Sequence, residues 1–238
     1  MKKLILTSFI CFILGSLLAQ NSWKHFLDHK SGEVIIYYYD SENYIINKNG
    51  RFEGVEYQLF IEFFDFIEKK YQINIKPRFV RADSFGQLYQ SILKGKNGEF
   101  GACSFSMTPE RMLEVHFSPR YLPDIEVMVS SNDLPIVDDT ASFLKHFSTA
   151  TAYAVRNTTF EADILQIKKM IPNLKIVYLK TGLEVLQKVN DGKNCFGYAE
   201  LANYITSFQN GLTIKRQSLF RTERLGHGFI YPNSSNYF

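Results

Sequence analysis

This chain of 238 residues contains little cysteine and tryptophan, and its histidines form no metal-binding pattern. It has three cysteines and one tryptophan, too few cysteines for the framework of a small disulfide-stapled domain. Cys103 and Cys195 lie in apolar, strand-like runs, where we expect buried free thiols because free cysteine behaves as a small hydrophobe. A disulfide between them is the alternative. The five histidines show no metal-ligand spacing. The sequence therefore predicts neither a metal site nor a cofactor.

An excess of charge of one sign is also missing. Lysine and arginine number 27, aspartate and glutamate 24, and the formal net charge is +3 with no block of like charge. Such a balance gives no reason to expect nucleic acid as a partner. The Gly-x-Ser-x-Gly, His-Glu-x-x-His and glycine-rich phosphate-loop motifs are absent as well. We therefore predict a protein that is not an enzyme.

One long apolar run is present, at the start of the chain. Residues 4–18 are almost wholly apolar, follow Lys2 and Lys3, and end just before Ala19. The run is fifteen residues long, whereas a membrane-spanning helix needs roughly twenty. We predict a signal peptide over 1–19, cleaved after Ala19, and a periplasmic mature protein that does not span the membrane. A retained membrane anchor is the alternative.

Segments typical of strands alternate with segments typical of helices along the rest of the chain. This alternation favours mainly parallel sheets built from βαβ units. The predicted strands are 34–39, 73–80, 100–105, 152–155, 176–179, 195–198 and 224–230. The predicted helices are 56–71, 85–94, 159–170 and 182–190.

These segments divide into two units of α/β structure. We assign residues 20–129 and 221–238 to lobe 1 and residues 130–220 to lobe 2. The strand over 224–230 is expected to return to the first unit. The chain must then cross between the lobes twice.

Motifs in both halves resemble one known family. Gly54–Leu59 opens a helix, and Ser104–Arg111 combines a strand end with a Thr-x-x-Arg element, followed by Val115–Ser118. These marks resemble lobe 1 of the extracellular solute-binding proteins of family 3, the receptors of polar amino-acid importers. His116 stands where that family usually has aspartate. In the second half, the strand end before Thr159 and the strand ending at Glu200 are similar to the family's second lobe.

The resemblance implies a fold and a partner. The fold is α/β, a two-lobed type 2 periplasmic-binding-protein fold in which each lobe is a mainly parallel sheet flanked by helices, with the ligand cleft between them. The implied partner is the permease of an ABC-type importer. Family members generally continue past the returning strand into helices that cover lobe 1, whereas this sequence ends at Phe238. Either the chain is truncated or part of lobe 1 is bare. The opening over 43–57 is most similar to the amino-terminal sensor module of membrane-bound lytic transglycosylase F.

The resemblance also assigns the two charged ends of an amino-acid zwitterion. Arg111 is the predicted carboxylate clamp, because a guanidinium fork fits a carboxylate with two parallel hydrogen bonds. The Ser106 N–H and the Thr159 N–H at a helix start would complete that carboxylate site. Glu200 would neutralise the ammonium from lobe 2, and Ser104 and the Ser106 hydroxyl would face the ammonium from lobe 1.

Tyr44 and Phe85 are expected at the cleft mouth, over the apolar part of the ligand. Each assigned residue has a plain structural alternative. Arg111 and Glu200 are equally typical of exposed helix and strand ends, the serines of strand ends, and Thr159 of a helix cap. Tyr44 and Phe85 are equally typical of a core.

Three functions remain open at this stage. The first is a periplasmic receptor that captures an amino acid or similar zwitterion for an importer. The second is a stand-alone sensor of cell-wall fragments or amino acids. The third is an enzyme, because the implied fold also carries exported cyclohexadienyl dehydratases, in which a cleft carboxylate such as Glu200 assists catalysis.

Overall fold

The structure is a computed structural model that describes residues 22–41 and 43–235, with the side chains of Arg221 and Glu223 excepted. The predicted signal peptide and its cleavage site lie outside the described residues. Among the described helices, none is both long and apolar enough to cross a membrane. Cys103 and Cys195 are buried free thiols, as predicted.

Lobe 1 is built on a five-stranded sheet with the order β4-β1-β5-β12-β6. Strand β1 runs parallel to both β4 and β5, whereas β12 is antiparallel to β5 and β6. A two-stranded hairpin of β2 and β3 follows β1. The elements of this lobe are α2 (Trp23–His29), β1 (Ser31–Tyr38), β2 (Ile46–Lys48), β3 (Arg51–Glu53), α3 (Val55–Tyr71), β4 (Asn74–Arg81), α4 (Phe85–Leu93), β5 (Glu99–Ala102), α5 (Pro109–Glu114), β6 (Val115–Phe117) and β12 (Ile230–Pro232).

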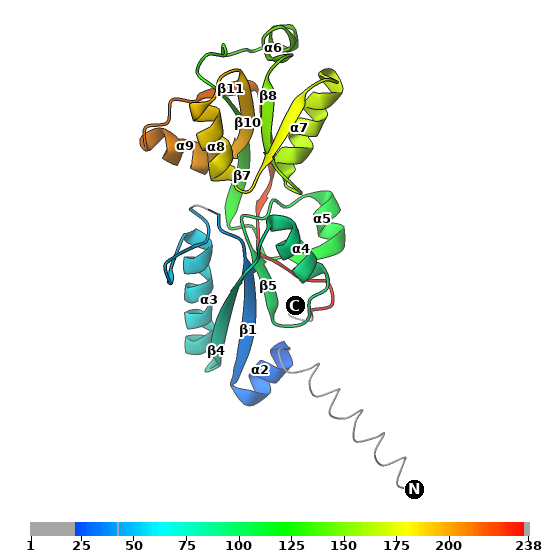
Figure 1. Cartoon of the computed structure of the whole chain (residues 1–238). Helices are drawn as coiled ribbons and strands as arrows, with labels where there is room; N and C mark the ends of the chain where they lie inside the picture. Colours follow the sequence, from blue (N-terminus) through cyan, green and yellow to red (C-terminus); the bar gives the residue numbers. More distant parts are fainter. Residues whose placement is uncertain (1–21, 42, 236–238) are drawn as a thin grey trace.

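Lobe 2 is built on a second five-stranded sheet with the order β11-β7-β10-β8-β9. Strands β8, β9 and β10 are mutually parallel where they pair, and β7 and β11 are antiparallel additions. Figure 1 shows this lobe above lobe 1, with β7 running between them. Its elements are β7 (Leu122–Ser130), α6 (Thr140–Phe147), β8 (Thr151–Val155), α7 (Thr159–Met170), β9 (Lys175–Leu179), α8 (Gly182–Asp191), β10 (Cys195–Glu200), α9 (Leu201–Gln209) and β11 (Lys215–His227).

Each lobe buries its own apolar core. In lobe 1, Ile36 on β1 and Phe60 on α3 belong to a cluster of buried side chains between sheet and helix. In lobe 2, Phe143 and Phe196 belong to a separate cluster. Independent cores allow two lobes to keep their shapes while they move relative to one another.

Helix starts in both lobes carry the expected capping residues. The side chains of Ser84, Thr158 and Thr181 accept hydrogen bonds from backbone N–H groups in the first turns of α4, α7 and α8. Such caps satisfy donors that have no partner inside the helix. The starts of these helices are therefore fixed by the local sequence.

The predicted boundaries between the lobes need correction. Strand β7 pairs with β10 and β11 along most of its length, so residues 122–129 belong to the second sheet and not, as predicted, to lobe 1. Strand β11 likewise extends to His227, and only β12 joins the first sheet. The predicted return strand over 224–230 is thus two strands in two sheets. The cause is the hinge: two long antiparallel strands cross it together and pair with each other on the way.

Candidate ligand-binding site

A cavity of about 140 Å³ lies between the two lobes. Its lining comes largely from residues at or just beyond the carboxyl ends of the parallel strands. In lobe 1 these are Tyr39, Asp40 and Ser41 after β1, and Cys103, Ser104 and Ser106 after β5. In lobe 2 they are Val155 on β8, Lys180 after β9 and Glu200 on β10. Carboxyl ends of parallel strands are where open α/β sheets bind ligands.

Arg111 lines the cavity from lobe 1. It lies in the first turn of α5, whose cap Thr108 accepts the Arg111 backbone N–H. Its guanidinium donates to the Ser106 carbonyl at 3.1 Å and, across the cleft, to the Asn157 carbonyl at 3.4 Å. Within the described residues it forms no ion pair with a carboxylate. Two carbonyl contacts orient the fork, while the nearest acids, Glu126 and Asp124, act on its charge only from beyond ion-pair distance.

An aromatic wall supports the Arg111 guanidinium. Its carbon Cζ lies 5.3 Å from the ring centre of Phe85 and 5.9 Å from that of Tyr89. A cation over an aromatic face is attracted by the ring quadrupole. Burial lowers the pKa of Arg111, but an arginine remains charged in proteins. Phe85 therefore both lines the cavity and holds the cation in place.

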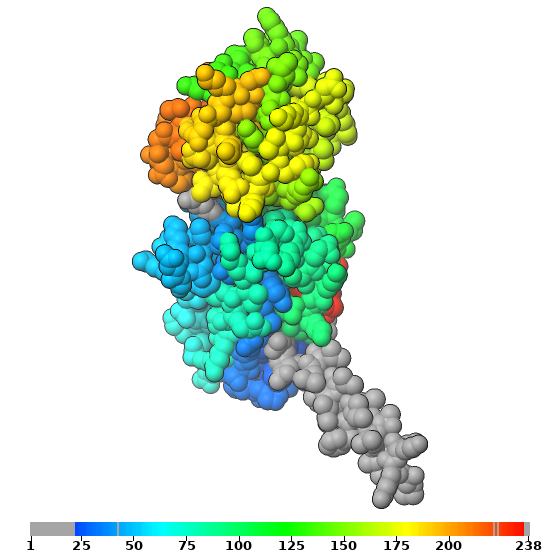
Figure 2. Space-filling view, viewed as in Figure 1, coloured from blue at the N-terminus to red at the C-terminus, as the bar shows by residue number. Residues whose placement is uncertain are grey.

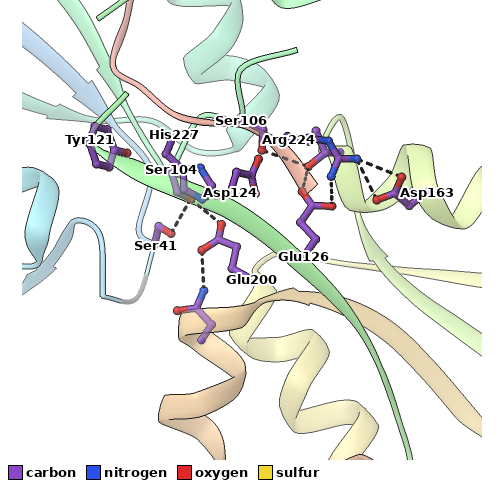
Figure 3. Close-up of polar contacts among 12 residues, drawn as sticks. Ser41, Ser104, Ser106, Tyr121, Asp124, Glu126, Asp163, Glu200, Arg224 and His227 are labelled. Carbon is purple, nitrogen blue, oxygen red and sulfur yellow. Dashed lines mark hydrogen bonds and ion pairs between the residues drawn. The ribbon is translucent and has the colours of Figure 1, made fainter. Parts of the chain in front are cut away.

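Glu200 lines the cavity from lobe 2, at the end of β10. Its carboxylate accepts the Ser104 hydroxyl at 2.9 Å and the Asn203 amide at 3.2 Å (Figure 3). Burial raises its pKa to about 8, against hydrogen bonds from the Ser104 and Tyr44 hydroxyls and with help from Asp124 and Glu56. Of the side chains that the structure describes, none forms an ion pair with it. Without a cation beside it, this buried acid is mostly protonated near pH 7.

Ser104 is held in an unusual backbone conformation below the cavity. Its φ of 45° is in the left-handed region, which non-glycine residues seldom adopt. The buried carboxylate of Glu56 accepts its N–H at 3.0 Å and also accepts the Tyr121 hydroxyl. This frees the Ser104 hydroxyl to reach Glu200 in the other lobe.

Ser106 and Thr159 meet from opposite lobes. Their hydroxyl oxygens lie 3.4 Å apart, and the Thr159 hydroxyl donates to Glu126 at 2.6 Å. Thr159 is the first residue of α7, and Thr158 is the cap. The predicted carboxylate site therefore has its helix start in place beside Ser106.

A buried ion network lies behind Thr159. Arg224 on β11 pairs with Glu126 on β7 and, at 2.9 and 3.1 Å, with Asp163 on α7. The side chains of Arg224 and Glu126 are only 13% and 1% exposed. Burial raises the pKa of Glu126, and the Arg224 charge opposes the rise. The network ties both hinge strands to the helix that presents Thr159.

The structure brings six of the seven predicted residues to one cavity: Phe85, Ser104, Ser106, Arg111, Thr159 and Glu200. Tyr44 is different. It is 3% exposed, its ring meets that of His227 at 5.3 Å, and its hydroxyl is hydrogen-bonded to Glu200. It lies behind the acid instead of at the cleft mouth, because the backbone of its loop is fixed to α3.

Sequence reasoning missed several polar lining residues, among them Asp40, Cys103, Lys180 and Asn203. Cys103 and Lys180 directly follow strands β5 and β9, and Asp40 follows strand β1 after one intervening residue. A search of every residue after a predicted strand would have found these three. Asn203 lies one turn into α9, a helix that the sequence analysis did not predict.

The lobes touch at several points around the cavity. The Tyr39 hydroxyl donates to the Lys180 carbonyl at 2.7 Å. Gly86 on α4 faces Asn157, and a Cβ at Gly86 would lie 2.6 Å from the Asn157 amide nitrogen. Figure 2 shows the atoms of the two lobes in contact along their boundary. The two lobes are therefore in direct contact around the cavity.

Across the described part of the chain, no group of three or more His, Cys, Asp or Glu side chains is arranged to hold a metal ion.

No protein-family model and no curated protein sequence matches this chain. Solved structures match at low identity. A putative binding component of an ABC transporter from Wolinella succinogenes, complexed with lysine, has a TM-score of 0.67 at 18% identity, over 86% of this chain and 84% of that one. The GluR0 ligand-binding core from Nostoc punctiforme, in complex with L-glutamate, has a TM-score of 0.66 at 14% identity, over 86% and 87%.

An ancestral amino-acid-binding protein, a precursor of cyclohexadienyl dehydratase, has a TM-score of 0.63 at 17% identity, over 88% of this chain and 85% of that one. At such identities the likeness shows the fold alone. The chain has the two-lobed α/β fold of type 2 periplasmic binding proteins, which confirms the predicted fold class.

Proposed function

We propose that this chain is an exported receptor that captures an amino acid or similar small zwitterion between its lobes. One observation carries the proposal: Arg111 and Glu200 line one cavity from opposite lobes, and among the described residues neither has an ion-pair partner. A zwitterion supplies one carboxylate and one ammonium, so it neutralises both charges only when the lobes are together. Ligand-driven closure of this kind is characteristic of periplasmic binding proteins.

The function that we favour is that of a receptor for an ABC-type importer. The protein would be exported to the periplasm by its signal peptide, which is then cleaved. The amino-acid-binding transporter component among the similar structures supports this choice. A stand-alone sensor uses the same pocket, and the ligand-binding core from Nostoc punctiforme supports that alternative. The resemblance of the opening segment to the transglycosylase sensor module remains a prediction.

A thermal-shift screen of the twenty amino acids and of muropeptides tests the proposed function. A ligand at one hundred times its dissociation constant adds about 2.7 kcal/mol of stability. For a chain of this size that is a rise of roughly 5 to 10 °C in the melting temperature. The matched control is Arg111→Ala, which should lose the rise. If no amino acid or muropeptide stabilises the folded protein, the receptor proposal is wrong.

An enzymatic function has one observation in its favour. Burial raises the pKa of Glu200 to about 8, so the group carries a proton near neutral pH and is suited to general acid chemistry. The dehydratase precursor among the similar structures points to the reaction to test. Incubating the protein with prephenate or arogenate and following ultraviolet absorbance distinguishes an enzyme from a receptor. If the protein turns over either compound and Glu200→Gln abolishes the turnover, the enzymatic function replaces the receptor proposal.

Ligand binding should release a proton from Glu200. Below pH 8 the free carboxyl is mostly protonated, because burial raises its pKa to about 8. A bound ammonium favours the charged form and lowers that pKa. Affinity should therefore rise as the pH increases toward 8, with roughly one proton released per ligand at pH 7. Calorimetry in buffers of different ionisation enthalpy measures this number.

The Glu200→Gln variant is the control, since it has no proton to release at this position.

The stability of the ligand-free protein should show the opposite dependence on pH from the ligand affinity. With its raised pKa the native state binds more protons than the unfolded state between pH 4.5 and 8, so stability falls as the pH rises through this window. Proton uptake on binding, or an affinity independent of pH, would rule out an ammonium at Glu200.

A further inference from the structure

The cavity acid Glu200 is held by donors from both lobes. Lobe 1 supplies the Ser104 hydroxyl at 2.9 Å and the Tyr44 hydroxyl, and lobe 2 supplies the Asn203 amide at 3.2 Å. None of these donors carries a charge. Although Glu200 precedes α9, its side chain does not cap that helix. The carboxylate is thus held by neutral side-chain donors and not by the backbone N–H groups of the helix start.

The loop that carries Asn43 and Tyr44 is fixed to lobe 1. The Val55 N–H donates to the Asn43 carbonyl at 3.0 Å, and the Glu56 N–H donates to the Tyr44 carbonyl at 2.8 Å. Both donors lie in the first turn of α3, where backbone N–H groups lack helical partners. Gly54 makes this possible, because its φ is 113° and a Cβ there would lie 2.2 Å from the Tyr44 carbonyl oxygen.

From this fixed loop, two side chains cross to lobe 2. The Tyr44 hydroxyl reaches Glu200 directly. The Asn43 amide donates to Asn203 Oδ1 at 2.8 Å and to Thr206 at 3.4 Å. Asn43 has a φ of 67°, a conformation that asparagine tolerates better than most residues. The turned backbone therefore aims the Asn43 amide across the cleft.

The contact from Asn43 also fixes the orientation of the Asn203 amide. An asparagine amide has one accepting and one donating end. Because Oδ1 of Asn203 accepts from Asn43, its nitrogen Nδ2 must face Glu200, which it does at 3.2 Å. A hydrogen-bonded chain of this kind polarises toward its acceptor.

We propose, resting on the proposed receptor function, that Asn43, Tyr44 and Asn203 are positioning residues that complete the ammonium site only when the lobes meet. Lobe 1 fixes the Tyr44 hydroxyl and the Asn43 amide, and lobe 2 brings Asn203 and Glu200 to them. None of the three needs to touch the ligand. Their joint effect is to favour the charged form of the acid at the moment of closure.

The other ionisable groups near Glu200 act in the opposite direction. Glu56 on α3 and Asp124 on β7 raise its pKa by their negative charge. Tyr121 beside β7 and Cys103 after β5 also interact with it electrostatically, and burial raises the pKa of each, so both are neutral near pH 7. The donors from Tyr44 and Asn203 therefore work against two buried acids.

The test is a carbon-13 NMR titration of the full-length mature protein labelled at glutamate side-chain carboxyls, with Glu200 assigned by Glu200→Gln. Tyr44→Phe keeps the ring and removes the donor, and should move the Glu200 midpoint up by about one pH unit. Asn203→Ala should move it in the same direction. Asn43→Gly should also raise the midpoint, by less, because it acts through Asn203.

Two control variants separate positioning from general structural effects. Asn49→Gly replaces another asparagine with a left-handed backbone, φ 55°, in the turn between β2 and β3, and should leave the midpoint unchanged. Tyr71→Phe, at the far end of α3, should do likewise. If Tyr44→Phe and Asn203→Ala both fold and leave the Glu200 midpoint at the wild-type value, the positioning proposal fails.

The Asn203→Ala shift needs no ligand, because Asn203 and Glu200 both belong to lobe 2, and it is therefore independent of the receptor proposal. The Tyr44→Phe and Asn43→Gly shifts are expected only when the lobes are together. A chain that binds no amino acid but shows the expected midpoint shifts would retain the positioning network and lose the proposed function. A chain that binds an amino acid without those shifts would retain the function and lose the network.

Discussion

Replacing Arg111 with alanine is expected to weaken amino-acid binding by roughly thirty-fold to several-thousand-fold. Removal of one partner from a buried, hydrogen-bonded charge pair typically costs about 2 to 5 kcal/mol, because the remaining charge is left desolvated and unpaired. In this protein the remaining charge would be the ligand carboxylate. The Arg111 guanidinium is already oriented by two backbone carbonyls and by Phe85, so little ordering is needed on binding. Calorimetric titration with the amino acid selected by thermal shift measures the loss.

Two further variants sharpen this experiment. Arg111→Lys keeps the charge but loses the planar fork and its stacking on Phe85, so we expect a large part of the loss to remain. Arg78→Ala is the matched control: Arg78 is 55% exposed and pairs with Glu33 on the surface of lobe 1, and its removal should change affinity by less than about twofold. Binding by folded Arg111→Ala within threefold of wild type would end the carboxylate-clamp assignment.

Replacing Arg224 with methionine is expected to lower the free energy of unfolding by about 3 to 5 kcal/mol. That is the usual loss when one partner of a buried ion pair is removed. Methionine restores much of the apolar volume, so the loss reports the charges left on Glu126, which is 1% exposed, and on Asp163. Urea unfolding at pH 7 measures it. Arg78→Met breaks an exposed ion pair instead and should cost no more than about 1 kcal/mol.

A double-mutant cycle tests the reason for this loss. Glu126→Gln removes the buried negative charge and keeps an acceptor for the Thr159 hydroxyl. In the Glu126→Gln background, Arg224→Met should therefore cost much less, with a coupling of about 1 to 3 kcal/mol. Additivity of the two single changes within about 0.5 kcal/mol would show that Arg224 stabilises the hinge by packing and not by pairing with Glu126.

The strands and helices that pack on the parallel sheets were predictable, and for a local reason. Each has a continuous apolar face and a capping residue, as at Ser84 and Thr181, within a short stretch of chain. Helices α2, α5, α6 and α9 were not predicted. Each has at most nine residues, so its apolar positions span too few turns to stand out as a helical period in the sequence. The lobe boundaries were misplaced since β7 and β11 read as ordinary strands, and which sheet a strand joins depends on its distant partner.

The candidate site was predictable where a motif and a strand end coincide, as for Arg111 and Glu200. Phe85, Ser104, Ser106 and Thr159 followed from the same positions. Tyr44 was recognised as relevant but misplaced, since only the folded loop shows that it lies behind the acid.

The Glu126–Arg224–Asp163 network could not have been predicted. Its members are separated by up to about one hundred residues along the chain and have no motif around them. Only the register of β7 against β11 brings Glu126 and Arg224 together.

Gly86 and Asn157 set a mechanical stop on the approach of the two lobes. The stop is made by protein atoms alone: α4 presents a residue without a side chain, and the Asn157 backbone, with its φ of 64°, holds the opposing amide. In the proposed receptor, a ligand small enough to fit inside the cavity would leave this contact in place, so strong and weak ligands would end in the same outline. They would differ in how long the outline lasts, and a partner protein that recognises the outline would respond to that lifetime and not to the identity of the molecule inside.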